Sequence, residues 1–195
     1  MDIDDLKQLN SLWTKLYPYL ASQIMEGYQR DSGAVLELGP FSGGISKELT
    51  KGYPGLSIII AAESPAVLEY LREEMSRLSE RINIVKTDLY HLPFEDSQFD
   101  LVIFRGAFFF LKEDLLQEIF RVLKDGGMAF VGGGFGKGVP KELIDEIADE
   151  SRQLNSRLGR RWVSIEELHE IVRRSSLTDR CQIVEEGGVW LHIRR

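Results

Sequence analysis

The stretch VLELGPFSGGIS, residues 35–46, is the strongest indication of how this chain folds. It begins as a short apolar strand and then turns through Gly39, Gly43 and Gly44 toward a following helix. Residues without a Cβ atom allow positive φ angles and let the backbone approach a ligand closely. Phe41 stands where a dinucleotide-binding turn, G-x-G-x-x-G, has its second glycine. The stretch therefore predicts a strand–turn–helix unit that can hold a ligand, without the spacing typical of a dinucleotide site.

On both sides of this stretch, short strands alternate with helices. We expect parallel strands over residues 34–38, 56–63, 82–88, 99–106 and 127–133. These strands are apolar on both faces, as strands between two layers of helices are, and their alternation with helices implies right-handed crossovers. Residues 181–195 form two strand-like runs around a Gly-Gly pair, which predicts a hairpin. The expected fold class is α/β, a doubly wound, mostly parallel seven-stranded sheet with a C-terminal antiparallel β-hairpin.

The two ends of the chain flank this sheet. Residues 1–30 have the apolar spacing of helices, interrupted near Pro18, and are expected to form an N-terminal helical cover. Residues 33–134 hold the ligand-binding core, and residues 135–195 supply two more helices and the hairpin. Because no linker or repeat separates these parts, we expect a single Rossmann-like domain over residues 1–195.

Composition and charge argue against several classes of function. The net charge of −7 disfavours nucleic acid or an anionic membrane as the main partner, since both require clustered basic residues. The one cysteine, Cys181, excludes an internal disulfide, and the three histidines lack the spacing of metal ligands. No apolar run reaches the ~20 residues that span a bilayer. These properties favour a cytoplasmic enzyme or binding domain without a metal site.

An acidic residue follows the second expected strand. Glu63 lies about twenty residues beyond the first turn, where an acid can accept both hydroxyl groups of a ribose. Its charge disfavours NADP, whose 2′-phosphate would be repelled. The alternative is that Glu63 helps to cap the next helix together with Ser64 and Pro65.

Four segments, in their order along the chain, resemble the class I S-adenosylmethionine-dependent methyltransferases. They are VLELGPFSGG, Glu63, DLYHLPFEDSQFDLVIFRG and RVLKDGG, and together they cover about residues 33–134. The resemblance is strongest to the small-molecule, type 11-like branch, with its D-x-x-x-LPF-x-x-x-x-FD segment and LKPGG turn. It implies S-adenosylmethionine as cofactor and a small-molecule methyl acceptor. The chain departs from the pattern at Phe41, which replaces a glycine, and at Asp125, which replaces a proline.

The resemblance also implies a set of site residues. The cofactor-binding residues would be Glu37, Gly39, Phe41, Gly43, Glu63, Ser64, Asp88, Leu89 and Arg105. Among them, Glu37 and the first turn would hold the methionine end, Glu63 the ribose, and Asp88 with Leu89 the adenine. The acceptor pocket would include Trp13, Tyr17, Phe108 and Phe109, although core packing is an alternative role for these aromatic side chains.

Methyl transfer is an in-line displacement, so positioning supplies much of the acceleration and a dedicated base is optional. His91 is the one candidate base, and its alternative role is to shield the adenine as a polar loop residue. Two other functions stay open at this point. One is a non-catalytic S-adenosylmethionine-binding or regulatory module. The other is a nicotinamide oxidoreductase, which the altered glycine spacing and the terminal hairpin disfavour.

Overall fold

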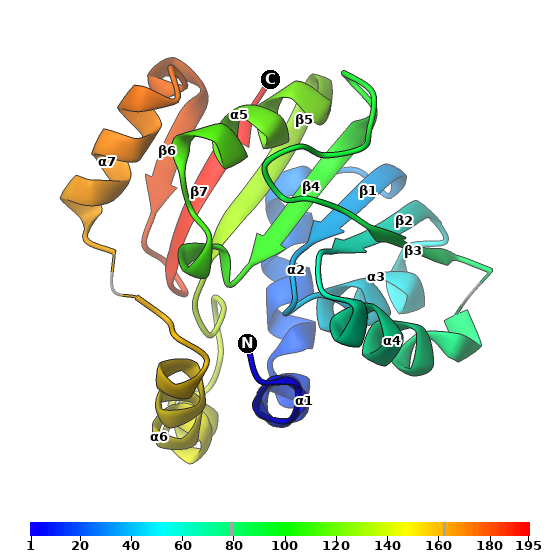
Figure 1. The fold of residues 1–195 in the computed structure, drawn as a ribbon, viewed down its shortest axis with the longest axis vertical. Coiled ribbons are helices and arrows are strands. Elements are labelled where there is room, and N and C mark those ends of the chain that lie inside the picture. The colour runs from blue at the N-terminus through cyan, green and yellow to red at the C-terminus, as the bar shows by residue number, and fades with distance from the viewer. Residues whose placement is uncertain (79, 162) are drawn as a thin grey trace.

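A computed structural model describes residues 1–78, 80–161 and 163–195. At its centre is a seven-stranded sheet with the order β3-β2-β1-β4-β5-β7-β6 (Figure 1). The strands are β1 (Ser32–Leu38), β2 (Gly55–Ala62), β3 (Ile82–Lys86), β4 (Phe99–Arg105), β5 (Leu123–Gly133), β6 (Cys181–Val184) and β7 (Val189–Arg194). Strands β1 to β5 pair in parallel, whereas β7 runs antiparallel to both β5 and β6. The fold class predicted from the sequence, including the terminal hairpin, is confirmed.

Helices cover both faces of this sheet. They are α1 (Ile3–Leu12), α2 (Tyr17–Tyr28), α3 (Gly44–Gly52), α4 (Pro65–Glu74), α5 (Glu113–Val122), α6 (Lys141–Arg157) and α7 (Ile165–Arg174). Apolar residues of α2, α3 and α4 join one buried cluster with Val35 and Leu101. Those of α5 and α7 join a second cluster with Leu36 and Val102 on the opposite face. Successive strand residues thus face alternate layers, as a strand with both faces buried requires.

The N-terminal helices and α6 lie near the edge of the sheet at which β4 ends (Figure 1). Trp13, in the short 3₁₀ helix η1 (Trp13–Lys15), donates from Nε1 to Ser151 Oγ of α6 at 2.9 Å. Asp5 of α1 pairs with Arg157 of α6 at 2.7 Å. The predicted N-terminal helical cover is therefore present, and α6 holds it in place.

Tyr17 fixes this cover to the first turn of the chain. A Cβ atom at Gly44 would lie only 2.2–2.4 Å from three ring atoms of Tyr17. The face of the ring therefore packs directly on the glycine at the start of α3, an approach that no larger residue permits.

The RVLKDGG segment takes a conformation that the sequence did not predict. Strand β5 begins at Leu123 rather than at residue 127, because Leu123 already pairs with Phe99. The next paired residues are Leu101 and Met128, so the intervening residues bulge out of the strand. Gly126, with φ of 74°, accommodates the sharp turn.

Asp100, of the FD pair in the resembling segment, has a structural role. Its Oδ2 accepts from the Ala34 backbone N–H at 2.8 Å and from Lys124 Nζ at 2.6 Å. These bonds join the beginnings of β1, β4 and β5. The motif acid therefore stabilises the end of the sheet opposite to the first turn.

Candidate functional site

The first turn follows β1 and enters α3. Gly39 and Gly43 have φ of 91° and 102°, in the region that favours glycine, as the sequence predicted. The Gly39 N–H donates to the carbonyl of Ala61 at 2.9 Å, so the turn stays in register with the end of β2. Its backbone is held beside the neighbouring strand, where ligands bind in open parallel sheets.

Glu37 lies beneath this turn and is fully buried. One carboxylate oxygen, Oε2, accepts from the Ser46 backbone N–H at 3.1 Å and from the Ser46 hydroxyl. The other oxygen, Oε1, has no partner among the described residues. Burial raises the pKa of Glu37, and the hydrogen bonds from Ser46 and Gly43 oppose this shift only in part. Glu37 thus secures the start of α3 and retains one oxygen for another donor.

Glu63 and Leu89 connect the ends of β2 and β3. Glu63 follows Ala62, the last residue of β2, and is exposed. Its Oε1 accepts from the Leu89 backbone N–H at 3.2 Å. Ser64 is the N-cap residue of α4, but its side chain makes no capping hydrogen bond. The carboxylate of Glu63 therefore lies at the carboxyl edge of the sheet, between the loops predicted to hold ribose and adenine.

Asp88 and His91 lie in the loop after β3. Asp88 Oδ1 accepts from the Tyr90 backbone N–H at 2.8 Å, and its Oδ2 lies 3.4 Å from His91 Nδ1. These two neighbours lower the pKa of Asp88, the Tyr90 backbone bond more than His91. His91 is exposed, with 86% of its side-chain surface accessible. Both side chains thus face solvent at the site edge, and Asp88 is kept ionised.

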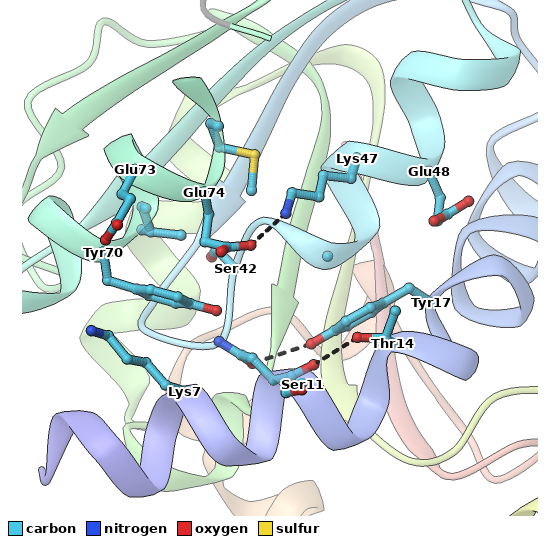
Figure 2. Close-up of a pocket in the computed structure, with 14 residues that line it drawn as sticks. Lys7, Ser11, Thr14, Tyr17, Ser42, Lys47, Glu48, Tyr70, Glu73 and Glu74 are labelled. Carbon is cyan, nitrogen blue, oxygen red and sulfur yellow. Dashed lines mark hydrogen bonds and ion pairs between the residues drawn. The ribbon is translucent and has the colours of Figure 1, made fainter. Parts of the chain in front are cut away.

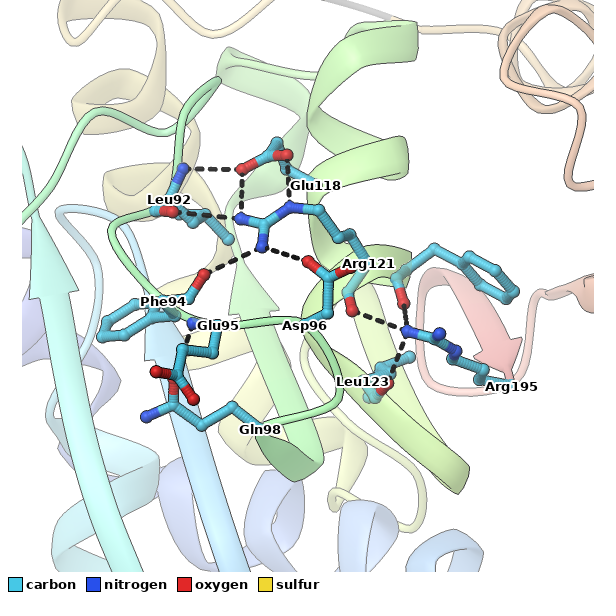
Figure 3. Close-up of polar contacts among 10 residues, drawn as sticks. Leu92, Phe94, Glu95, Asp96, Gln98, Glu118, Arg121, Leu123 and Arg195 are labelled. Carbon is cyan, nitrogen blue, oxygen red and sulfur yellow. Dashed lines mark hydrogen bonds and ion pairs between the residues drawn. The ribbon is translucent and has the colours of Figure 1, made fainter.

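Arg121 of α5 forms hydrogen bonds with a later part of the loop after β3 (Figure 3). Its guanidinium donates to the carbonyls of Leu92 at 3.0 Å and Phe94 at 2.8 Å, and pairs with Asp96 at 2.8 Å. Glu118, one helical turn earlier, pairs with Arg121 at 2.8 Å and accepts from the Leu92 backbone N–H at 2.7 Å. The LPF segment is therefore shaped by contacts with α5.

Replacing Arg121 by methionine is expected to lower the free energy of unfolding by about 1–2 kcal/mol, because the loop carbonyls lose their donors. The measurement is urea denaturation of the purified variant. Arg152→Met is the matched control, since Arg152 is exposed on α6 and bonds only to Asp149 among the described residues. Equal stability of the two variants would contradict this role for Arg121.

Arg105, the last residue of β4, is buried, with 3% of its surface exposed. Its Nη2 donates to Asn10 Oδ1 at 2.7 Å, to the Tyr17 hydroxyl at 3.0 Å and to the Phe41 carbonyl at 2.7 Å. The aromatic rings of Trp13, Tyr17 and Phe41 surround the guanidinium at 4.8–5.4 Å. Its Nε has no hydrogen-bond partner among the described residues. Arg105 thus ties both N-terminal helices to the first turn.

Comparison with known proteins agrees with this geometry. The sequence profile described as a methyltransferase domain matches residues 36–131, about half of the chain. A solved structure from Methanococcus maripaludis, described as a candidate S-adenosyl-L-methionine-dependent methyltransferase, superposes with a TM-score of 0.82 at 28% identity. The superposition covers 97% of this chain and 91% of the Methanococcus maripaludis chain. The chain belongs to the class I S-adenosylmethionine-dependent methyltransferases.

Two curated relatives of this methyltransferase are both called malonyl-[acyl-carrier protein] O-methyltransferase. The protein from Geobacter sulfurreducens is 32% identical over 111 residues, which are 56% of this chain and 41% of the relative. That from Priestia megaterium is 25% identical over 162 residues, 80% of this chain and 58% of the relative. The chain thus spans between two fifths and three fifths of the length of these relatives.

Phe41 is the main departure of this methyltransferase from its family pattern. The side chain is buried, with 1% exposed, and its ring centroid lies 4.9 Å from that of Phe109. A Cβ atom at Gly106 would lie 2.4 Å from the Phe41 ring. The ring therefore fills the space above the glycine that follows β4, between Phe109 and the Arg105 guanidinium.

The four residues predicted to line the acceptor pocket are packed closely in the methyltransferase. Trp13, Tyr17 and Phe108 are each less than 10% exposed, and Phe109 is partly buried. Trp13 stacks on Phe135 with ring centroids 5.5 Å apart. Burial raises the pKa of Tyr17 to about 12, an effect that Arg105 opposes. Tyr17 also borders a cavity between α1, α3 and α4 (Figure 2).

The residues around the first turn of the methyltransferase fit the amino-acid end of S-adenosylmethionine. That end carries an ammonium group, which donates hydrogen bonds, and a carboxylate, which accepts them. Among the residues that the structure describes, the buried Glu37 Oε1 has no donor and the buried Arg105 Nε has no acceptor. Buried polar atoms are rarely left unpaired, so these two indicate a polar ligand at this place. No cluster of three potential metal ligands occurs in the described part of the chain.

Asn10 and Ser42 were missed by the sequence analysis. Both are buried, and each has a side-chain atom without a partner in the described structure. Asn10 has no sequence signal because it lies within an ordinary amphipathic helix. Ser42 belongs to the first turn, and its position directly before Gly43 and Gly44 could have indicated from the sequence that it is a site residue.

Proposed function

We propose that this methyltransferase transfers the methyl group of S-adenosylmethionine to a small molecule. We further propose that the cofactor contacts Glu37, Gly39, Phe41, Gly43, Glu63, Ser64, Asp88, Leu89 and Arg105. When bound, this cofactor supplies an electrophilic methyl group on a sulfonium centre. The observation that carries the assignment is the exposed Glu63 carboxylate, bonded to Leu89 N–H, at the edge of the sheet where β1 and β2 end.

The residues of the chain have separate roles in this proposal. Glu63 accepts from the ribose hydroxyls, and the ionised Asp88 accepts from the exocyclic amine of adenine. The backbone of the first turn and Glu37 hold the amino-acid end. Trp13, Tyr17 and the aromatic side chains after β4 exclude water from the reacting centre. His91, exposed at the edge of the site, is the candidate base, and positioning supplies much of the rate acceleration.

The acidic charge of the chain supports a small-molecule acceptor rather than a nucleic acid. No helix in the described ranges is long and apolar enough to cross a bilayer. As part of the same proposal we place the enzyme in the cytoplasm, in keeping with its single cysteine.

Calorimetry with S-adenosylhomocysteine tests cofactor binding directly. We expect saturable binding by the wild-type protein, and absence of heat at millimolar ligand would overturn the proposal. Methyl transfer is then assayed with radiolabelled cofactor against small carboxylic acids, amines and thiols. Malonyl-acyl-carrier protein joins this set because two curated relatives are named for it. Binding without transfer to any acceptor would favour the non-catalytic alternative.

A further inference from the structure

Strand β6 forms one edge of the seven-stranded sheet, so it is paired only on the side of β7 (Figure 1). In an antiparallel strand, the backbone groups of alternate residues point to opposite sides. Half of those in β6 therefore point away from the sheet. No backbone hydrogen bond joins residues 181–184 to a segment other than β7 within the described chain. This edge thus offers donors and acceptors to a further strand.

The side chains of β6 do little to keep another strand away. Edge strands are commonly protected by a charge, a proline or a bulge. The sequence of β6 is CQIV, and its described pairing with β7 is regular. Ile183 and Val184 are only partly buried. The opposite edge strand, β3, differs because it ends at the exposed Lys86. The edge at β6 is therefore the one that favours pairing.

The distribution of charge indicates how two copies of this chain can approach each other. Residues 135–195 contain equal numbers of acidic and basic side chains, so the net charge of −7 belongs to residues 1–134. Two copies therefore repel each other least when they meet through the C-terminal part. Strand β6 lies in that part, and α7 belongs to the buried cluster on which Cys181 and Ile183 pack. The open edge is thus also the part of the surface where a second copy is tolerated best.

Symmetry limits how β6 can pair with β6 of a second copy. Continuing a sheet through a two-fold axis makes the two edge strands antiparallel, and outward-pointing residues must face each other. The axis must therefore lie at a residue, and only axes at Gln182 or Ile183 pair strand residues on both sides of it. With the axis at Gln182, Asp179 would lie opposite Glu185 of the second copy, and these like charges repel.

With the axis at Ile183, the charges attract instead. Arg180 then lies opposite Glu186 of the second copy, and the symmetry repeats this pair on the other side of the axis. The two Ile183 side chains meet at the axis, which buries apolar surface that is partly exposed in one copy. Arg180 and Glu186 are both exposed, and Glu186 also lies 3.5 Å from Lys137 Nζ. Charge and apolar contact thus select the same register.

We propose that the protein forms a two-fold symmetric dimer in which the β6 strands of two copies pair with the axis at Ile183. The two sheets then form one continuous sheet, and the Arg180–Glu186 pairs fix the register. A pair of short strands buries little area, so α7 of each copy, which lies beside β6 in Figure 1, contributes to the contact. The inference does not rest on the proposed function, because β6 and α7 contain none of the proposed cofactor-binding residues.

Sedimentation equilibrium over a range of protein concentrations measures the mass and the dissociation constant. We expect the wild type to reach twice the mass of one chain. Arg180→Glu and Glu186→Arg each place like charges opposite each other twice, and each should raise the dissociation constant about tenfold or more. An equimolar mixture of the two variants should dimerise again, because the reversed charges are then complementary. Arg152→Glu, which reverses an exposed charge on α6, is the control and should change nothing.

A monomer at every concentration would overturn the inference, as would a dimer whose dissociation constant neither reversal changes. Amide hydrogen exchange tests the interface itself. The outward amides of residues 181–184 should exchange more slowly in the wild type than in Arg180→Glu at the same protein concentration, and equal rates would contradict pairing through β6. Thermal melting establishes that each variant is folded. Failure to bind S-adenosylhomocysteine would disprove the proposed function and leave these measurements unaffected.

Discussion

Replacing Glu63 by alanine is expected to weaken S-adenosylhomocysteine binding by about ten- to a hundredfold. The reason is the loss of a charged acceptor for the ribose hydroxyls, which contributes about 1.5–3 kcal/mol. The substitution also removes the bond that joins Glu63 to Leu89, so the loop after β3 loses one of its anchors. Calorimetry with S-adenosylhomocysteine measures the change in dissociation constant.

Two further variants separate the two effects of Glu63→Ala. Glu63→Gln keeps an acceptor oxygen for Leu89 but carries no charge, so it should retain part of the affinity. Glu69→Ala removes an exposed carboxylate from the following helix, α4, and should bind as the wild type does. If the Glu63→Ala variant binds S-adenosylhomocysteine as tightly as the wild type does, Glu63 has only a structural role in the loop. The assignment of Glu63 to the ribose would then be wrong.

Glu37→Gln is expected to make the fold more stable and cofactor binding weaker. Glu37 is fully buried and burial raises its pKa, so the folded protein binds the proton more tightly than the unfolded chain does. In the wild type, the contribution of Glu37 to the free energy of unfolding is therefore fully present at acid pH. It is lost as the pH rises from the pKa in the unfolded chain, near 4.5, through the higher pKa in the folded protein. Glutamine avoids this loss because it has no charge to bury.

The same change removes the partner for the ammonium group of the cofactor. Loss of that charge-assisted bond should weaken S-adenosylhomocysteine binding about ten- to a hundredfold, with little effect on 5′-methylthioadenosine. Urea denaturation between pH 4 and pH 8 gives the stability difference, which should grow with pH in favour of Glu37→Gln. Glu185→Gln, at an exposed position, is the control. A variant less stable than the wild type at neutral pH would mean that the bonds to Ser46 outweigh the cost of burying the charge.

The fold was largely predictable from local patterns in the chain. Glycines at positive φ after β1, apolar strands and the Gly187-Gly188 hairpin turn depend on neighbouring residues, so each could be recognised by itself. The extension of β5 back to Leu123 was not predicted, because it depends on pairing with Phe99 across a bulge. In the sequence of a single strand, a glycine-rich bulge resembles the end of the strand, because the pairing across the bulge involves the neighbouring strand.

The candidate site was predictable only in part. The collinear segments placed Glu37, Glu63 and Asp88 at neighbouring strand ends, since parallel strands bring their carboxyl ends to one edge. The packing of Phe41 against Gly106 and Phe109 was not predicted, because it depends on the meeting of two separate loops. Sequence reasoning recognised that residue 41 departs from the pattern but had no means to place its ring.

The order and type of the elements and the parallel arrangement of the core strands follow from the amino-acid sequence alone, because each is governed by short-range periodicity and turn chemistry. The roles of Glu37 and Asp88 were implied by the family resemblance of their segments. The bonds from Arg105 to Asn10 and Tyr17 arise only when the chain packs, since the first joins residues 95 positions apart. Hydrogen-bond satisfaction inside the protein depends on which buried groups meet. It is therefore the tertiary packing that leaves one oxygen of Glu37, and side-chain atoms of Asn10 and Ser42, without a hydrogen-bond partner within the described part of the chain.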